Sequence, residues 1–366
     1  MARTGTVPTV NPRPSGSVLA ADPLARVAAL PGVREAADSA RAAVDALLRH
    51  RILRRQSAAV TTEASLRAAR ASAALEGHEI SLEGLRGYLS GAGTDARPTP
   101  ASEGRLAPDP AAPNPAAPNP AAPDAAAPDA AAPDAAARTF PPAVGVPADL
   151  RSTDSLDLSS TDLPSPVVLG TVRLYAELGV LGPAWERAPR QALARMHVLV
   201  GRGYLPDDLL GRPRADAGTR ELLDPLRLGP PPHSVETSVR LDGLTGLLVT
   251  PTTAPAVVVA AVVHGELLAL RPFGALDGVI ARAASRLVLI SRGLDPKALT
   301  ATDVGHLEVD HIDDPGAPVL GYRDAAAAYV GGGAQGVATW VLHCAKALEL
   351  AARESLAVCE ALARDT

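Results

Sequence analysis

A loop that could hold an anion lies within residues 270–282, which read Leu-Arg-Pro-Phe-Gly-Ala-Leu-Asp-Gly-Val-Ile-Ala-Arg. A long apolar stretch precedes this loop, and the residues that follow it are predicted to form a helix with Arg282 one turn in. A glycine-containing loop that leads into a helix N-terminus suits phosphate, because free backbone N–H groups and the helix dipole both favour an anion. Arg271, Gly278 and Arg282 are therefore the candidate phosphate-binding residues.

The loop resembles the signature of the Fic (Fido) family of AMP-transferases, which is H-P-F-x-[D/E]-G-N-G-R-x-x-R. The positions that match this signature are Pro272, Phe273, Gly278 and Arg282. Other features extend the resemblance over about residues 165–350: His264 ahead of the loop, the segment 192–197, the prolines 230–232, Tyr329 and Trp340.

The resemblance implies ATP and Mg²⁺ as cofactors, with a histidine base, an acidic metal ligand and a triphosphate-binding arginine. Those three positions hold Arg271, Ala275 and Val279. A guanidinium stays protonated and cannot act as a base, so no catalytic residue is assigned. Leu276 disfavours the positive φ angles of a phosphate nest, and Asp277 brings a negative charge. Arg271 has a structural alternative, which is to cap a helix C-terminus or to pair with Asp277.

A second motif of the same family lies upstream, at Ser72, Glu76 and Gly77. These residues fit the inhibitory pattern [S/T]-x-x-x-E-[G/N]. In regulated family members this glutamate pairs with the second arginine of the signature, which here is Arg282, and blocks the γ-phosphate. The resemblance therefore predicts an ion pair between Glu76 and Arg282 that docks the N-terminal helices, in the same chain or in a neighbour.

Two metal-site alternatives carry less support. His264-Gly265-Glu266 matches half of a zinc deaminase signature, but the P-C-x-x-C half is missing. We therefore predict a core histidine and no metal. A histidine-bearing acidic stretch could hold a cation, although a solvated connector explains it as well; it comprises His306, Asp310, His311, Asp313 and Asp314.

A glycine-rich stretch offers a different class of function. Residues Gly331–Gly336 satisfy the pattern G-x-G-x-x-G. A dinucleotide site needs a β-strand before that pattern, whereas the alanine-rich residues 324–329 favour a helix. A dinucleotide-binding oxidoreductase is therefore kept as a second alternative, and a loop between two helices is the expected structure.

Proline and composition divide the chain into segments. Residues 93–165 contain five-residue repeats of the type AAPNP and AAPDA, whose regular proline blocks a continuous helix. This segment and residues 1–23 are predicted to be disordered. Residues 24–92 are predicted to form a helical N-terminal module, and residues 166–366 a Fic-like domain.

The predicted fold is mainly α, with at most a short β-hairpin flap at residues 211–214. In the N-terminal module we expect helices over 33–48 and 61–75, the second capped by Thr61 or Thr62. In the domain we expect helices over 166–178, 185–203, 233–249, 254–270, 278–292, 299–305, 322–329 and 336–363.

Composition excludes several function classes. Aromatic residues make up only 2% of the chain and alanine is abundant, which favours closely packed helices. A net charge of −5 argues against nucleic acid or an anionic membrane as partner. No apolar run is long enough to span a bilayer, and no signal peptide is recognised. Cys344 and Cys359 are too far apart on one helix to form a disulfide, as expected in the cytoplasm.

These features lead to two principal hypotheses. The first is a degenerate Fic-domain protein that is defective in AMP transfer. It would act as a regulatory or nucleotide- or phosphate-binding module with an unidentified protein partner, and a homodimer stays open. The alternative is a divergent Fic-type nucleotidyltransferase that AMPylates proteins through another base or donor. The alternative predicts label transfer that increases when Glu76 is changed to glycine.

Overall fold

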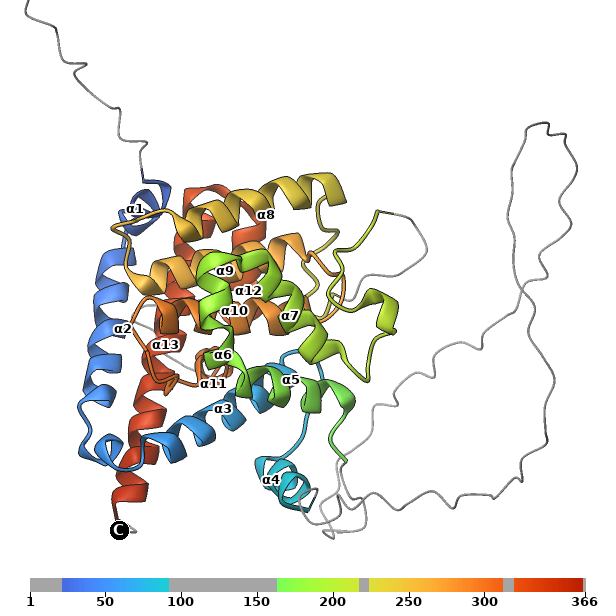
Figure 1. Ribbon diagram of the computed structural model, residues 1–366. Coiled ribbons are helices and arrows are strands. Elements are labelled where there is room, and N and C mark those ends of the chain that lie inside the picture. The colour runs from blue at the N-terminus through green and yellow to red at the C-terminus, as the bar shows by residue number, and fades with distance from the viewer. Residues whose placement is uncertain (1–21, 92–162, 217–223, 312–318, 365–366) are drawn as a thin grey trace, which may run out of the picture. The chain divides into compact units, whose positions relative to one another are not determined.

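The computed structural model describes residues 22–91, 163–216, 224–311 and 319–364. Within these residues the chain forms helices joined by turns and loops (Figure 1), and no strand. The helices are α1 Pro23–Ala28, α2 Val33–Leu48, η1 Arg51–Arg54, α3 Ser57–Ala74, α4 Leu82–Gly91, α5 Pro166–Ala176, α6 Leu178–Arg187, α7 Pro189–Gly201, η2 Asp207–Leu209, α8 Ser234–Val249, α9 Ala256–Leu270, α10 Asp277–Ser291, α11 Thr302–Val309, α12 Tyr322–Gly331 and α13 Gly333–Arg364. The mainly α fold predicted from the sequence is confirmed.

The helices before residue 92 and those after residue 161 belong to one compact unit. Helices α2 and α13, far apart in the sequence, lie side by side (Figure 1), and α3 packs against both α5 and α11. The N-terminal helices therefore share a core with the C-terminal ones. Disorder was predicted for residues 1–23 and 93–165, of which residues 1–21 and 93–162 lie outside the described residues. At the edges the prediction is wrong, because α1 begins at Pro23 and the Ser165 side chain caps α5.

Helix α9 is the centre of this core, in contact with α2, α8, α10, α12 and α13. Its sequence is apolar on every side, as a fully surrounded helix requires. Small residues allow close approach: a Cβ on Gly265 would lie 2.8 Å from Trp340 Nε1. The same indole N–H donates to the Ala261 carbonyl oxygen at 2.7 Å. Helix α9 therefore places the start of the candidate loop on a rigid element.

Several predicted helix boundaries are wrong; the helix predicted over 299–305, for example, is α11 over Thr302–Val309. Helix α3 begins at Ser57 without a side-chain cap, and the Thr61 hydroxyl donates to the Lys297 carbonyl oxygen at 2.9 Å instead. The single helix predicted over 185–203 is two helices, α6 and α7, because Pro189 has no N–H with which to continue the first.

The described part of the segment predicted as a hairpin flap contains no strand. Residues 211–216 follow an irregular path. The Arg214 N–H donates to the Pro272 carbonyl oxygen at 2.8 Å, and its side-chain Nε donates to the Arg271 carbonyl oxygen at 2.9 Å. This segment is thus fastened along the candidate loop.

Among the described helices, none is by itself both long and apolar enough to cross a membrane. Helices α5 and α6 meet those criteria only as a pair, and they are bent by 68°.

Candidate functional site

The loop between α9 and α10, residues 271–276, has the tight backbone path that an anion site needs. Arg271, Gly274 and Leu276 have positive φ angles of 42°, 77° and 60°. The left-handed conformation costs a non-glycine residue roughly 1–2 kcal/mol. Leu276 adopts it because its side chain is held in the core, with only 3% of the residue exposed. Packing therefore overrides the intrinsic preference that argued against this path.

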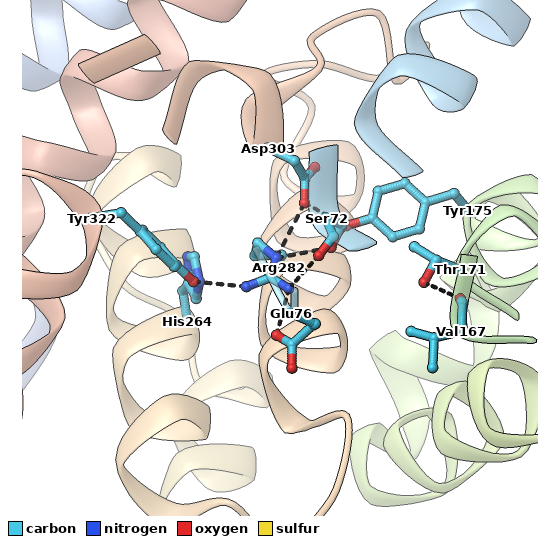
Figure 2. Close-up of polar contacts among 9 residues, drawn as sticks. All are labelled: Ser72, Glu76, Val167, Thr171, Tyr175, His264, Arg282, Asp303 and Tyr322. Atoms are coloured by element: carbon cyan, nitrogen blue, oxygen red, sulfur yellow. Dashed lines mark hydrogen bonds and ion pairs between the residues drawn. The ribbon is translucent and has the colours of Figure 1, made fainter. Parts of the chain in front are cut away.

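Arg282 is the buried centre of a polar cluster one turn into α10 (Figure 2). Its Nη2 lies 2.8 Å from Glu76 Oε1 and donates to the Ser72 carbonyl oxygen at 2.9 Å. Its Nε donates to Ser72 Oγ at 2.8 Å and lies 3.5 Å from Asp303 Oδ1. Its Nη1 donates to the Tyr322 hydroxyl at 3.1 Å. The guanidinium is therefore surrounded by intrachain acceptors and carboxylates.

Glu76 lies against the first turn of α10. A Cβ added to Gly278 would collide with Glu76 Oε1, so the carboxylate rests directly on the backbone near the helix N-terminus. Gly77, with a φ of 84°, turns the chain immediately after it. The pair predicted between Glu76 and Arg282 is present within one chain, and its carboxylate occupies a place that suits an anion.

The cluster continues away from the loop on both sides. The Tyr175 hydroxyl donates to Asp303 Oδ1 at 2.6 Å. On the other side the Tyr322 hydroxyl lies 2.9 Å from His264 Nε2. Burial lowers the pKa of His264 well below its usual value, and the charge of Arg282 lowers it further. A neutral His264 can accept a hydrogen bond from the Tyr322 hydroxyl, whose oxygen in turn accepts a hydrogen bond from Arg282.

Arg271 makes a different set of contacts. Its backbone N–H donates to the Leu267 carbonyl oxygen at 3.0 Å, and its left-handed backbone, with a φ of 42°, ends α9. Its Nη1 lies 3.2 Å from Asp224 Oδ2, and its Nη2 donates to the Gly229 carbonyl oxygen. The cap position expected for Arg271 is therefore occupied, but among the described residues its ion-pair partner is Asp224 and not Asp277.

The remaining loop positions are filled by core packing. Ala275 and Val279 are 2% and 0% exposed, and they belong to the main hydrophobic core. The Phe273 ring stacks on His197 with centroids 4.4 Å apart. Asp277 Oδ1 accepts from the Phe273 N–H at 3.0 Å, and burial raises the pKa of Asp277 to about 7. Near neutral pH the carboxyl is therefore only partly ionised, where a full negative charge was expected.

Little space remains beside the loop. The cavity there has a volume of about 20 Å³, which is room for about one water molecule. It is lined by Glu76, Asp224, Pro225, Leu226, Leu228, Leu268, Arg271, Leu276, Asp277 and Gly278. A small-molecule pocket usually offers roughly 300–1,000 Å³, so this site is closed as it stands.

Neither metal-site alternative assembles in the described part of the chain, where no group of three or more His, Cys, Asp or Glu residues is placed to hold an ion. Glu266 of the half-signature binds Arg240 at 3.0 Å. His306 Nδ1 lies 3.0 Å from His343 Nε2 inside the core. Residues 313–314 of the acidic stretch lie outside the described residues.

The glycine-rich stretch lacks the setting that a dinucleotide site requires. Helix α12 runs to Gly331 and α13 begins at Gly333, so only Gly332 separates them. A helix therefore stands where the required strand would be. The oxidoreductase alternative loses the element on which it depended.

Comparisons with known proteins agree with this architecture. No protein-family model matches the sequence, and no curated protein does. The chain is similar to the crystal structure of a Fic family protein from Desulfovibrio desulfuricans G20, with a TM-score of 0.53 and 15% sequence identity. The match covers 88% of this chain and 74% of that chain. At such low identity the likeness shows the fold alone: this chain has a Fic-like helical fold.

Proposed function

We propose that this chain is a Fic-like protein that has lost AMP transfer and acts as a regulatory or binding module. The observation that carries the proposal is the buried ion pair of Arg271. This residue lies at the position of the base in the Fic signature, which the loop resembles. Its side chain is 6% exposed and paired with Asp224. A guanidinium has no lone pair with which to accept a proton from a target hydroxyl.

The residues around the loop do not fit Mg²⁺ and ATP. Protein carboxylates usually supply the protein ligands of a nucleotide-bound Mg²⁺, whereas the residue at the acidic position is Ala275, which is buried and has no oxygen in its side chain. The cavity of about 20 Å³ beside Gly278 is far smaller than a nucleotide. No catalytic step through a metal-bound nucleotide follows from this site.

The contact between Glu76 and Arg282 supports the regulatory part of the proposal. It joins the end of α3 to the first turns of α10 with a distance of 2.8 Å, and the glutamate side chain is 6% exposed. An anion that used Arg282 would have to displace this carboxylate and with it the end of α3. We expect a protein partner to act by changing this docking.

Label transfer from ATP carrying a labelled α-phosphate tests the loss of activity. The samples are the parent chain, Glu76→Gly and Glu79→Gly, each incubated alone and with a cell extract. Glu79 is the matched control, because it is an exposed acid three residues further on. We expect no transferred label from any of them, since removing Glu76 restores neither a base nor a metal ligand.

Transfer by Glu76→Gly, with none by Glu79→Gly, would overturn the proposal. It would favour the alternative of a divergent nucleotidyltransferase held inactive by the glutamate.

A further inference from the structure

Residues 224–229, referred to below as the 224–229 loop, form a small self-supported turn beside the candidate site. The Arg227 N–H donates to the Asp224 carbonyl oxygen at 3.0 Å. The Asp224 carboxylate then accepts from the N–H groups of Leu228 and Gly229, each at 2.9 Å. One carboxylate thus organises the whole turn, as aspartate commonly does at such positions.

A single guanidinium holds both ends of this loop. Arg271 Nη1 lies 3.2 Å from Asp224 Oδ2 at the start of the loop, and Nη2 donates to the Gly229 carbonyl oxygen at its end. The planar fork of arginine suits such a double contact, which a lysine could not reproduce. Arg271 itself is fixed in place as the residue that ends α9.

Two apolar side chains of the same loop pack beside the cavity next to Gly278. Leu226 is 9% exposed and belongs to the main hydrophobic core, and Leu228 packs against that core. Both line the cavity beside Gly278, together with Leu268 and Leu276. The loop therefore fills the space next to the anion position and leaves the volume of about 20 Å³.

We propose that the 224–229 loop, held by Arg271, is a second closure of this site that works independently of Glu76. The two closures use different cations: Asp224 is bound by Arg271, and Glu76 by Arg282. Both acids line the same small cavity. If Glu76 alone is removed, Leu226 and Leu228 consequently still fill the space beside Gly278.

This inference deepens the proposed function by assigning Arg271 a positive role. Arg271, at the position compared with the base of the Fic signature, binds the 224–229 loop of its own chain beside the cavity. The site opens only when both acids leave their arginines.

Hydrogen exchange of the full-length chain, followed by mass spectrometry, tests the independence of the two closures. Asp224→Asn should raise exchange in peptides covering 224–229 by roughly tenfold or more, because charged hydrogen bonds to two N–H groups and the ion pair are lost. Peptides covering 72–77 should keep their rate. Glu76→Gly should raise exchange in the peptides covering 72–77 and leave the rate of those covering 224–229 unchanged. Asp216→Asn is the control, because Asp216 also lies between α7 and α8 but contacts Ser234 and Arg214 and not the 224–229 loop.

Arg271→Lys provides a second variant that keeps the charge and loses the fork. It should also raise exchange in 224–229. The proposal is overturned if Asp224→Asn and Arg271→Lys both leave that exchange unchanged, or if Glu76→Gly alone raises it. Because exchange needs no nucleotide, these outcomes are separate from the transfer assay that tests the proposed function.

Calorimetry with inorganic tripolyphosphate gives an independent reading. We expect no binding heat from the parent, Glu76→Gly or Asp224→Asn, and binding by the Glu76→Gly/Asp224→Asn double variant. Binding by Glu76→Gly alone would show that the 224–229 loop does not close the site.

Discussion

Asp277, the first residue of α10, is an acid in surroundings that favour its neutral form. Burial raises its pKa to about 7, although the N–H groups of Phe273 and Gly274 act in the opposite direction. The folded chain therefore keeps this proton to a higher pH than the unfolded chain, in which an aspartate has a pKa of about 3.9. Between about pH 4 and pH 7 the folded state loses stability relative to the unfolded state as pH rises.

The substitution Asp277→Asn tests this titration, because asparagine keeps an oxygen for the Phe273 N–H and has no proton to lose. Relative to the parent, its free energy of unfolding should rise between about pH 4 and pH 7 by at most about 4 kcal/mol, which corresponds to about three pKa units. Urea unfolding over this pH range measures the difference. A difference that does not change with pH would contradict the burial argument.

At the scale of elements, α3 and α10 meet through a carboxylate that rests on a glycine. Glu76 follows α3, and Gly278 is the second residue of α10. The absence of a side chain at Gly278 is what admits the carboxylate, since a Cβ there would collide with Glu76 Oε1. The contact between the two helices therefore depends on both residues together.

A double-mutant cycle measures that dependence. Gly278→Ala should destabilise the parent, whereas in a Glu76→Gly background it should be neutral or stabilising by about 0.5–1 kcal/mol, since alanine favours helix. We expect a coupling free energy of roughly 1–3 kcal/mol. Gly87→Ala in α4, where a Cβ meets nothing within 4 Å, is the control and should show no coupling. Additive effects of Gly278→Ala and Glu76→Gly would refute the contact.

At the scale of the molecule, the compact unit is built from both ends of the described sequence. Helix α2 buries one face against α13, and that face consists of Val33, Ala37, Ala40, Val44 and Leu47. Helix α13 also contacts the central helix α9. Because the cores are continuous, we expect the N-terminal helices and the helices around α9 to unfold together.

The substitution Val44→Ala tests this cooperativity. Val44 is fully buried on α2, so truncation should cost about 2 kcal/mol. The midpoint temperature of thermal unfolding should fall by the same amount whether it is followed by far-ultraviolet circular dichroism or by tryptophan fluorescence. The fluorescence reports Trp185 and Trp340, which lie outside the N-terminal helices. Val180→Ala, at a residue 75% exposed, should change little. A two-step dichroism curve with fluorescence following only one step would indicate separate domains.

Much of the helical architecture was predictable from the sequence because helices are encoded by short-range patterns. The stripe over 33–48 and the continuous apolar run before the loop correspond to α2 and α9. One predicted boundary failed where no local signal existed, at Ser57, which starts α3 without a side-chain cap. The break before Pro189, by contrast, had a local signal that the prediction overlooked.

The candidate site divides in the same way. The sequence by itself determined which side chains occupy the two positions that were compared with a base and a metal ligand: the guanidinium of Arg271 cannot accept a proton, and the Ala275 side chain cannot bind a metal. Motif spacing also led to the contact of Glu76 with Arg282. Only the tertiary structure decided that Asp224 and Asp303 join these arginines, and that Leu276 holds a positive φ. The physical reason is that ion-pair partners and backbone strain depend on which distant segments pack together, and no local pattern records that.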